Sequence, residues 1–285
     1  MRVLLTNDDG VGAPGLVHLA GAVQRAGYDL IIAAPLYEAS GAGAGVGPVH
    51  TMGDGIVVER PKLPGLEDVV TYGVDALPAL IVLAACVGAF GQVPDVILSG
   101  INPGRNVGRA ALHSGTVGAA LTGVHFNKRA LAMSIQSGRF SGFESADGAI
   151  HFETACDVAT QLLPVVARAP ARTVVNCNVP NLPTAELRGI RTARLSRTGL
   201  VRSAVINEVA GSRMQLELGF VAPQPGDETD EALSTRGYVT LTPLVSVAED
   251  VRPDVLEIIE SAALDMQGAF GLAPEAAGTA DGPAA

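Results

Sequence analysis

The sequence is poor in charged residues, in cysteine and in long apolar runs. Charged side chains make up 17% of the 285 residues against 48% hydrophobic ones, which argues against global disorder and suits a globular enzyme. No apolar run reaches the roughly 18 residues of a membrane span. The net charge is −10 and there is no basic stripe, so we expect neither a membrane nor a nucleic-acid polymer as partner.

Cysteine is scarce as well. Cys86, Cys156 and Cys177 lack the spacing of a metal site and stand among apolar residues, so we predict buried, free thiols of a cytosolic protein. The chain also enters an Asp-Asp turn after a handful of apolar residues, which is not the pattern of a signal peptide. We therefore expect a cytoplasmic protein.

What the sequence does contain is an alternation of strands and helices. Strands that alternate with helices of ten residues or more need crossover connections, so the pattern predicts an α/β fold, Rossmann-like, with a mostly parallel sheet and helices on both faces. We expect strands at 3–5, 30–33, 55–59, 69–73, 95–99, 130–135 and 173–179, and helices from Pro14 and over 78–89, 115–126 and 150–166.

From about residue 187 the pattern becomes rich in short strands. We assign 1–189 to a catalytic core, 190–250 to a β-rich extension that serves oligomerisation, 251–267 to a C-terminal helix and 268–285 to a disordered tail. The extension lacks helical cover of its own, so it either packs on a neighbouring subunit or folds back on its core.

The first candidate site lies at the end of the first strand, where Asn7, Asp8, Asp9 and Gly10 follow an apolar run. In open α/β sheets ligands bind at the carboxyl ends of the strands. Two adjacent carboxylates repel each other unless a cation or a shared proton relieves them, and oxygen-only ligands suit Mg²⁺ or Mn²⁺. Alternatively the pair only caps the next helix and faces water.

Three further loops carry polar or glycine residues at the same predicted edge. Asn102 offers a carbonyl oxygen to a cation, or it only forms a turn with the Pro-Gly that follows. The stretch 114–116 either places helix N–H groups at an anion or contains an ordinary N-cap serine. The glycine-rich loop after Ser40 either allows close approach of a ligand or is only flexible.

These blocks together resemble the SurE family of 5′/3′-nucleotidases. The opening Leu-Leu-Thr-Asn-Asp-Asp-Gly, the Ser-Gly-Ile-Asn and the Ser-Gly-Thr-Val-Gly-Ala-Ala blocks carry most of the resemblance. Further matching blocks follow in order over roughly residues 1 to 245, at 13–15, 34–35, 40–41, 106, 108, 178–183, 188–190, 229–230 and 237–244. The resemblance implies a Rossmann-like core, a β-rich part that exchanges between subunits, and metal-dependent release of phosphate from nucleoside monophosphates.

Carried over by motif, the resemblance also implies the site residues. The metal ligands would be Asp8, Asp9, Ser40 and Asn102, with Mg²⁺ or Mn²⁺ as cofactor. The catalytic set would be Asp8, Asp9, Asn102 and Ser114, and the phosphate-binding set Asn7, Ser40, Gly41, Asn106, Ser114, Gly115 and Thr116. We expect a phosphate monoester as substrate and a homodimer or homotetramer; the alternatives are a phosphatase for a non-nucleotide ester and a non-catalytic nucleotide- or phosphate-binding homologue.

The chain departs from the family pattern at four positions. Leu80 stands where an Asp is usual, Arg109 and His113 lie where the family tends to carry acidic residues and a Tyr, and Thr122 replaces a usual Glu. His113 either donates a proton or binds phosphate, or it fills the space of the Tyr. Arg109 either binds a second anionic group of the substrate or faces solvent. These departures bear on substrate identity more than on reaction class.

Overall fold

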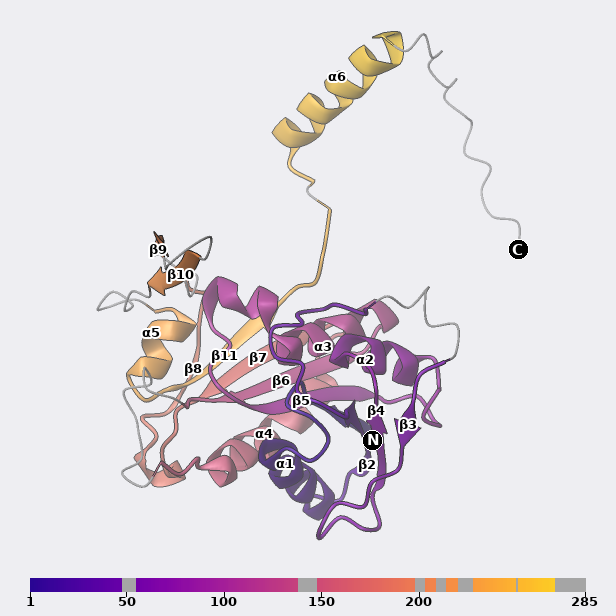
Figure 1. Cartoon of the computed structure of the whole chain (residues 1–285), viewed down its shortest axis with the longest axis vertical. Coiled ribbons are helices and arrows are strands. Elements are labelled where there is room, and N and C mark those ends of the chain that lie inside the picture. Colours follow the sequence, from indigo (N-terminus) through magenta and orange to yellow (C-terminus); the bar gives the residue numbers. More distant parts are fainter. Residues whose placement is uncertain are drawn as a thin grey trace. The chain divides into compact units, whose positions relative to one another are not determined.

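The fold is known from a computed structural model that describes residues 1–47, 55–137, 148–197, 203–208, 214–219, 228–249 and 251–269. The chain divides into two compact units, Met1–Ser246 and Val247–Ala285. The first unit contains a nine-stranded sheet flanked by helices (Figure 1). The predicted α/β class is therefore confirmed.

The strand order of this sheet is β3-β4-β2-β1-β5-β6-β7-β11-β8. The bounds are β1 Arg2–Thr6, β2 Asp29–Pro35, β3 Val58–Glu59, β4 Val70–Val74, β5 Val96–Pro103, β6 Arg129–Ile135, β7 Val174–Val179, β8 Ile190–Thr192 and β11 Val239–Leu244. Only two pairs, β3–β4 and β7–β11, run antiparallel; the other pairs are parallel. The carboxyl ends of β1, β2 and β5 thus meet at one edge.

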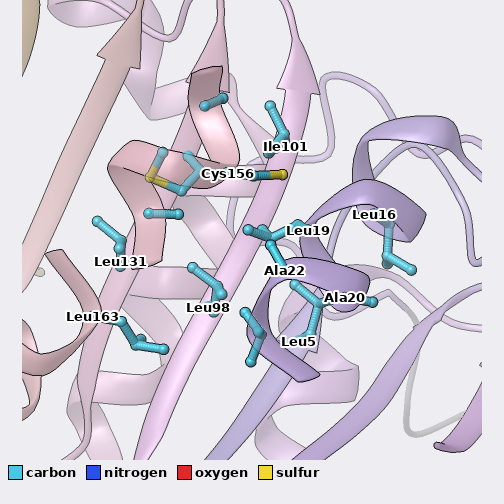
Figure 2. Close-up of a cluster of buried hydrophobic side chains, with 14 of the residues drawn as sticks. Leu5, Leu16, Leu19, Ala20, Ala22, Leu98, Ile101, Leu131, Cys156 and Leu163 are labelled. Atoms are coloured by element: carbon cyan, nitrogen blue, oxygen red, sulfur yellow. The ribbon is translucent and has the colours of Figure 1, made fainter. Parts of the chain in front are cut away.

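Helices cover both faces of the central strands. Consecutive side chains of a strand point to opposite faces of the sheet, and here both sets are apolar. Leu5 and Leu98 pack in one core with α1 (Pro14–Arg25) and α4 (Phe152–Arg168), and Figure 2 shows these side chains together. Leu4 and Ile97, their sequence neighbours, pack in a second core with α2 (Pro78–Cys86) and α3 (Gly115–Gly123). In Figure 1, α1 and α4 lie on one side of the sheet and α2 and α3 on the other.

A missing side chain sets how closely α1 approaches the sheet. A Cβ atom on Gly15 would lie 2.1 Å from the carbonyl oxygen of Ile101 in β5. Any larger residue at this position would push the first turn of α1 away from the end of β5, which carries Asn102. The helix therefore fixes the geometry of the sheet edge as well as covering the core.

Part of the segment 190–250 is integral to the main sheet, because β8 and β11 both lie within it. The helix α5 (Asp230–Thr235) precedes β11, and the short helices η2 (Gly108–His113), η3 (Val124–Phe126) and η4 (Thr184–Glu186) complete the first unit. The strands β9 (Ser203–Glu208) and β10 (Met214–Gly219) pair with each other in a separate antiparallel sheet. In the second unit, α6 spans Pro253–Ala269; the tail that we predicted to be disordered falls, from residue 270, outside the described residues.

The three cysteines are buried and free, as predicted. Burial raises the pKa of the Cys86 thiol to about 11 and that of Cys156 to about 12, so neither is a thiolate at neutral pH. In the part of the chain that the structure describes, no helix is long and apolar enough to cross a membrane.

Candidate active site

Backbone hydrogen bonds join the loops at the carboxyl edge of the sheet. The N–H of Ala39 donates to the carbonyl of Asp8 at 2.7 Å, which ties the Ser40 loop to the carboxylate pair. The N–H of Gly43 donates to the carbonyl of His113 at 3.2 Å, directly before α3. The loops after β1 and β2 and the start of α3, all predicted from sequence to form one site, are therefore brought together.

The Ser40 loop packs tightly on α3. A Cβ atom on Gly118 would lie 2.1 Å from the carbonyl oxygen of Gly43. Gly41 and Gly43 also have positive φ angles of 80° and 56°, which glycine adopts without strain. Glycine in this loop therefore serves a defined turn and a close backbone contact.

Asp8 is bound by the N-terminus of α3. Its side chain is buried, and its Oδ1 atom accepts a hydrogen bond of 2.5 Å from the hydroxyl of Thr116. Burial raises the pKa of Asp8, while the Thr116 hydroxyl and the backbone N–H groups of Gly115 and Thr116 act in the opposite direction. A Cβ atom on Gly115 would lie 2.7 Å from that of Asp8, so only glycine admits this contact.

The start of α3, where we predicted phosphate binding, therefore also contacts a carboxylate of the chain itself. The positive end of the α3 dipole favours the charged form of Asp8. Ser114 is the N-cap of α3, and its Oγ atom accepts a hydrogen bond of 3.1 Å from the N–H of Val117. Its hydroxyl hydrogen is not used in that bond.

Asp9 carries the uncompensated charge of the pair. Its pKa is raised to about 7, first by burial and then by the negative charges of Asp8 and Glu38. Its Oδ2 atom is buried and accepts no hydrogen bond from the described residues. Among the ion pairs of the described chain, none involves Asp8 or Asp9.

Three neighbouring polar side chains use their hydrogens locally. The amide of Asn7 donates to the carbonyl of Gly10 at 2.9 Å, and its Oδ1 atom is buried without a hydrogen bond from the described residues. The hydroxyl of Ser40 donates to Oε1 of Glu38 at 2.9 Å. The amide of Asn102 donates to the carbonyl of Gly104 at 2.7 Å. The oxygen atom of each of these side chains therefore remains as an acceptor.

These oxygens fit a hard divalent cation. Two carboxylates, two amide oxygens and a hydroxyl form the donor set that Mg²⁺ and Mn²⁺ prefer. Nowhere in the described ranges do three His, Cys, Asp or Glu side chains gather as a metal site. A cation at Asp8 and Asp9 would therefore rely on the amide and hydroxyl oxygens of Asn102 and Ser40.

Asn106 is held by hydrogen bonds to side chains of the buried strands β6 and β7. Its N–H donates to Oδ1 of Asn178 at 2.8 Å, its side-chain amide donates to Oγ of Ser134 at 2.9 Å, and its carbonyl accepts from the Asn176 amide at 2.7 Å. All three partners are fully buried. Our sequence analysis did not assign roles to Ser134 or Asn176; polar residues inside otherwise apolar strands were the available signal.

The loop after Asn106 is held by the C-terminal half of the same unit. The carboxylate of Asp230 accepts backbone N–H bonds from Gly108 at 2.8 Å, from Ser196 at 2.9 Å and from Glu231 at 2.8 Å. Arg105 donates to the hydroxyl of Thr235 in α5 at 2.8 Å. Sequence reasoning gave Asp230 no such role, because Gly108 and Ser196 lie far away in the chain.

The four departures from the family pattern differ in their environment. Leu80 is buried in the core with α2 and α3, and the hydroxyl of Thr122 donates to the carbonyl of Gly118 in its own helix at 2.8 Å. Arg109 and His113 are both exposed on η2, the short helix that leads into α3. Arg109 and His113 are therefore the exposed pair of the four, whereas Thr122 is half-buried.

Comparison with known proteins agrees with the sequence resemblance. The family model described as survival protein SurE matches residues 3–201. The 5'-nucleotidase SurE of Desulfitobacterium hafniense is 33% identical over 252 residues, which cover 88% of this chain and 93% of that protein. The 5'/3'-nucleotidase SurE of Salmonella paratyphi A is 34% identical over 91% of this chain and 98% of its own length. The crystal structure of the SurE protein from Aquifex aeolicus superimposes with a TM-score of 0.73 at 26% identity, covering 92% of this chain and all of that one.

The raised pKa of Asp9 predicts how stability depends on pH when no divalent cation is present. An acid whose pKa is higher in the folded state binds its proton more tightly there, so its contribution is full below pH 4 and is lost as pH rises through about 7. We expect the free energy of unfolding in chelator to fall by roughly 1–3 kcal/mol between pH 5 and pH 8.

Urea denaturation at the two pH values measures this change. The variant Asp9→Asn should lose stability less steeply over the same interval, while all other titrating groups stay the same. An identical pH dependence in both proteins would contradict the assignment to Asp9.

Proposed function

The chain belongs to the SurE family, and we propose that it is a nucleotidase that releases phosphate from nucleoside 5′- and 3′-monophosphates. The observation that carries the proposal is the pair of buried Asp8 and half-buried Asp9, which has no cationic partner among the described residues and stands beside oxygen acceptors. Such a pair at the carboxyl edge of an α/β sheet suits a site for a divalent cation and a phosphate.

In this proposal Asp8, Asp9, Ser40 and Asn102 hold Mg²⁺ or Mn²⁺. When bound, such an ion supplies Lewis-acid polarisation of a phosphate oxygen and lowers the pKa of a water. Asp9 would also orient the attacking water. Asp8 is held by the Thr116 hydroxyl at the start of α3, which fixes the position of the pair.

The remaining phosphate oxygens would be bound by Ser114 and Asn106. The Ser114 hydroxyl still has its hydrogen to donate, and the Asn106 amide has a second one beyond that given to Ser134. Gly115 and Thr116, which we first assigned to phosphate, would act through Asp8. Asn176 and Asn178 keep the backbone of Asn106 in place, so that its amide is positioned before the substrate arrives.

A second candidate function is a phosphatase that prefers an ester with an additional anionic group. Arg109 supports it, because this guanidinium is exposed next to α3 and pairs with no carboxylate of the described chain.

A cytoplasmic location is part of the first proposal. The three free buried thiols support it, and cell fractionation would test it.

Activity and its metal dependence are tested together. We expect inorganic phosphate release from nucleoside monophosphates, abolished by EDTA and restored by Mg²⁺ or Mn²⁺. Asp8→Asn should lower kcat by about 100-fold or more while the protein stays folded, because a ligand charge is lost. The matched variant Asp29→Asn should keep full activity, because Asp29 begins β2 and the candidate site lies at the carboxyl ends of the strands. A fully active Asp8→Asn protein would contradict the proposal, and absence of turnover on every monophosphate would favour a binding homologue.

Arg109 is tested by comparing substrates of different charge. If it binds a second anionic group, Arg109→Asp should lower kcat/KM about tenfold for a nucleoside 3′,5′-bisphosphate and leave the corresponding monophosphate nearly unchanged. For the bisphosphate, the kcat/KM of Arg109→Lys should lie between those of the wild type and of Arg109→Asp, because lysine keeps the charge but not the bidentate geometry. Equal losses on both substrates would assign Arg109 to the solvent-exposed surface.

We also propose that the chain forms a homodimer or homotetramer. The support is the pair β9–β10, which has no third strand within the described residues; an isolated two-stranded sheet is marginally stable in water. Light scattering at micromolar concentration should give at least twice the 29.0 kDa of one chain. A particle of single-chain mass would contradict the assembly.

A further inference from the structure

Glu38 lies next to Ser40, a proposed ligand of the candidate cation site, and neither the motifs nor the proposed ligand set includes it. It lies on the loop between β2 and Ser40 and is exposed to solvent. Its Oε1 atom accepts a hydrogen bond of 2.9 Å from the Ser40 hydroxyl.

The hydrogen bond to Glu38 decides what Ser40 can offer. A serine hydroxyl has one hydrogen and two lone pairs. When the hydrogen is directed to Glu38, both lone pairs of Ser40 Oγ remain for a cation. Without this acceptor the hydroxyl is free to rotate, and a part of its orientations would direct the hydrogen at the ion.

The loop backbone holds this arrangement in place. Ala39, the residue between Glu38 and Ser40, donates its N–H to the carbonyl of Asp8 at 2.7 Å. The carboxylate and the hydroxyl are therefore attached to the same backbone segment that carries the aspartate pair. Asn102 shows the same principle on β5, where its amide hydrogen is given to Gly104 and its oxygen stays available.

We propose that Glu38 is a positioning residue of the divalent-cation site: it orients the Ser40 hydroxyl so that its oxygen faces the ion, and it adds a third negative charge near Asp8 and Asp9. This role rests on the proposed function, since it concerns the cation that the nucleotidase would use. It extends that function by a residue outside the proposed ligand set. The role predicts an effect on ion affinity that can be measured without substrate.

The experiment is a titration of the metal-free protein with Mn²⁺ alone, with free Mn²⁺ followed by electron paramagnetic resonance. Glu38→Ala should weaken Mn²⁺ binding about tenfold, because the acceptor of the Ser40 hydroxyl and the third charge are both lost. The control Glu59→Ala, at another exposed glutamate, on β3, should bind as the wild type does. Thermal melts should be alike for all three, since both side chains are exposed.

A double-mutant cycle then tests whether Glu38 acts through Ser40. In a Ser40→Ala background the additional loss from Glu38→Ala should shrink to roughly threefold, the part that comes from charge alone. Unchanged Mn²⁺ affinity in Glu38→Ala would overturn the role while the nucleotidase proposal stands. Fully additive losses would overturn the positioning of Ser40. A wild-type protein that releases phosphate but binds no Mn²⁺ would overturn the cation site, and Glu38 with it.

Discussion

The repulsion between the neighbouring carboxylates of Asp8 and Asp9 is the constraint on which the rest of the site depends. Both are withdrawn from solvent, and burial raises the pKa of each. The protein treats them unequally: Thr116 and the start of α3 stabilise the charge on Asp8, whereas the buried Oδ2 atom of Asp9 has no donor in the described chain. A site built in this way is stable only when a proton or a cation completes it.

Close packing around glycine makes this arrangement possible. Gly115 lets α3 approach the carboxylate of Asp8, Gly118 admits the backbone of Gly43, and Gly15 lets α1 approach the carbonyl of Ile101. Each contact brings backbone to a distance that a Cβ atom would prevent. The helices α1 and α3, which cover opposite faces of the sheet, thus both contact the edge that carries the candidate site. The precision of the site comes from the packing of rigid elements rather than from the loops alone.

Sequence predicted the parts of this structure that depend on local pattern. The buried run 3–5, the Asn-Asp-Asp-Gly turn and the Ser114 cap follow from periodicity and turn chemistry, and the structure contains them. The role of α3 toward Asp8 was not predictable, because a helix N-terminus fits a phosphate and a carboxylate equally well. Ser134 and Asn176 escaped notice because polar residues in a strand also fit a solvent-exposed face. Asp230 acts on Gly108, 122 residues earlier in the chain.

That distant contact changes how the C-terminal half of the first unit is understood. A change in sequence pattern near residue 190 separates an alternating region from a strand-rich one, yet β8 and β11 complete the main sheet and Asp230 fixes the loop between Asn106 and α3. Arg105 adds a bond from the same loop to α5. If the loop binds phosphate as we propose, a group that orders it in advance lowers the cost of organising it when substrate binds. The strand-rich region therefore holds part of the candidate site as well as part of the sheet, and any exchange of its outer strands between subunits would act on that loop through Asp230.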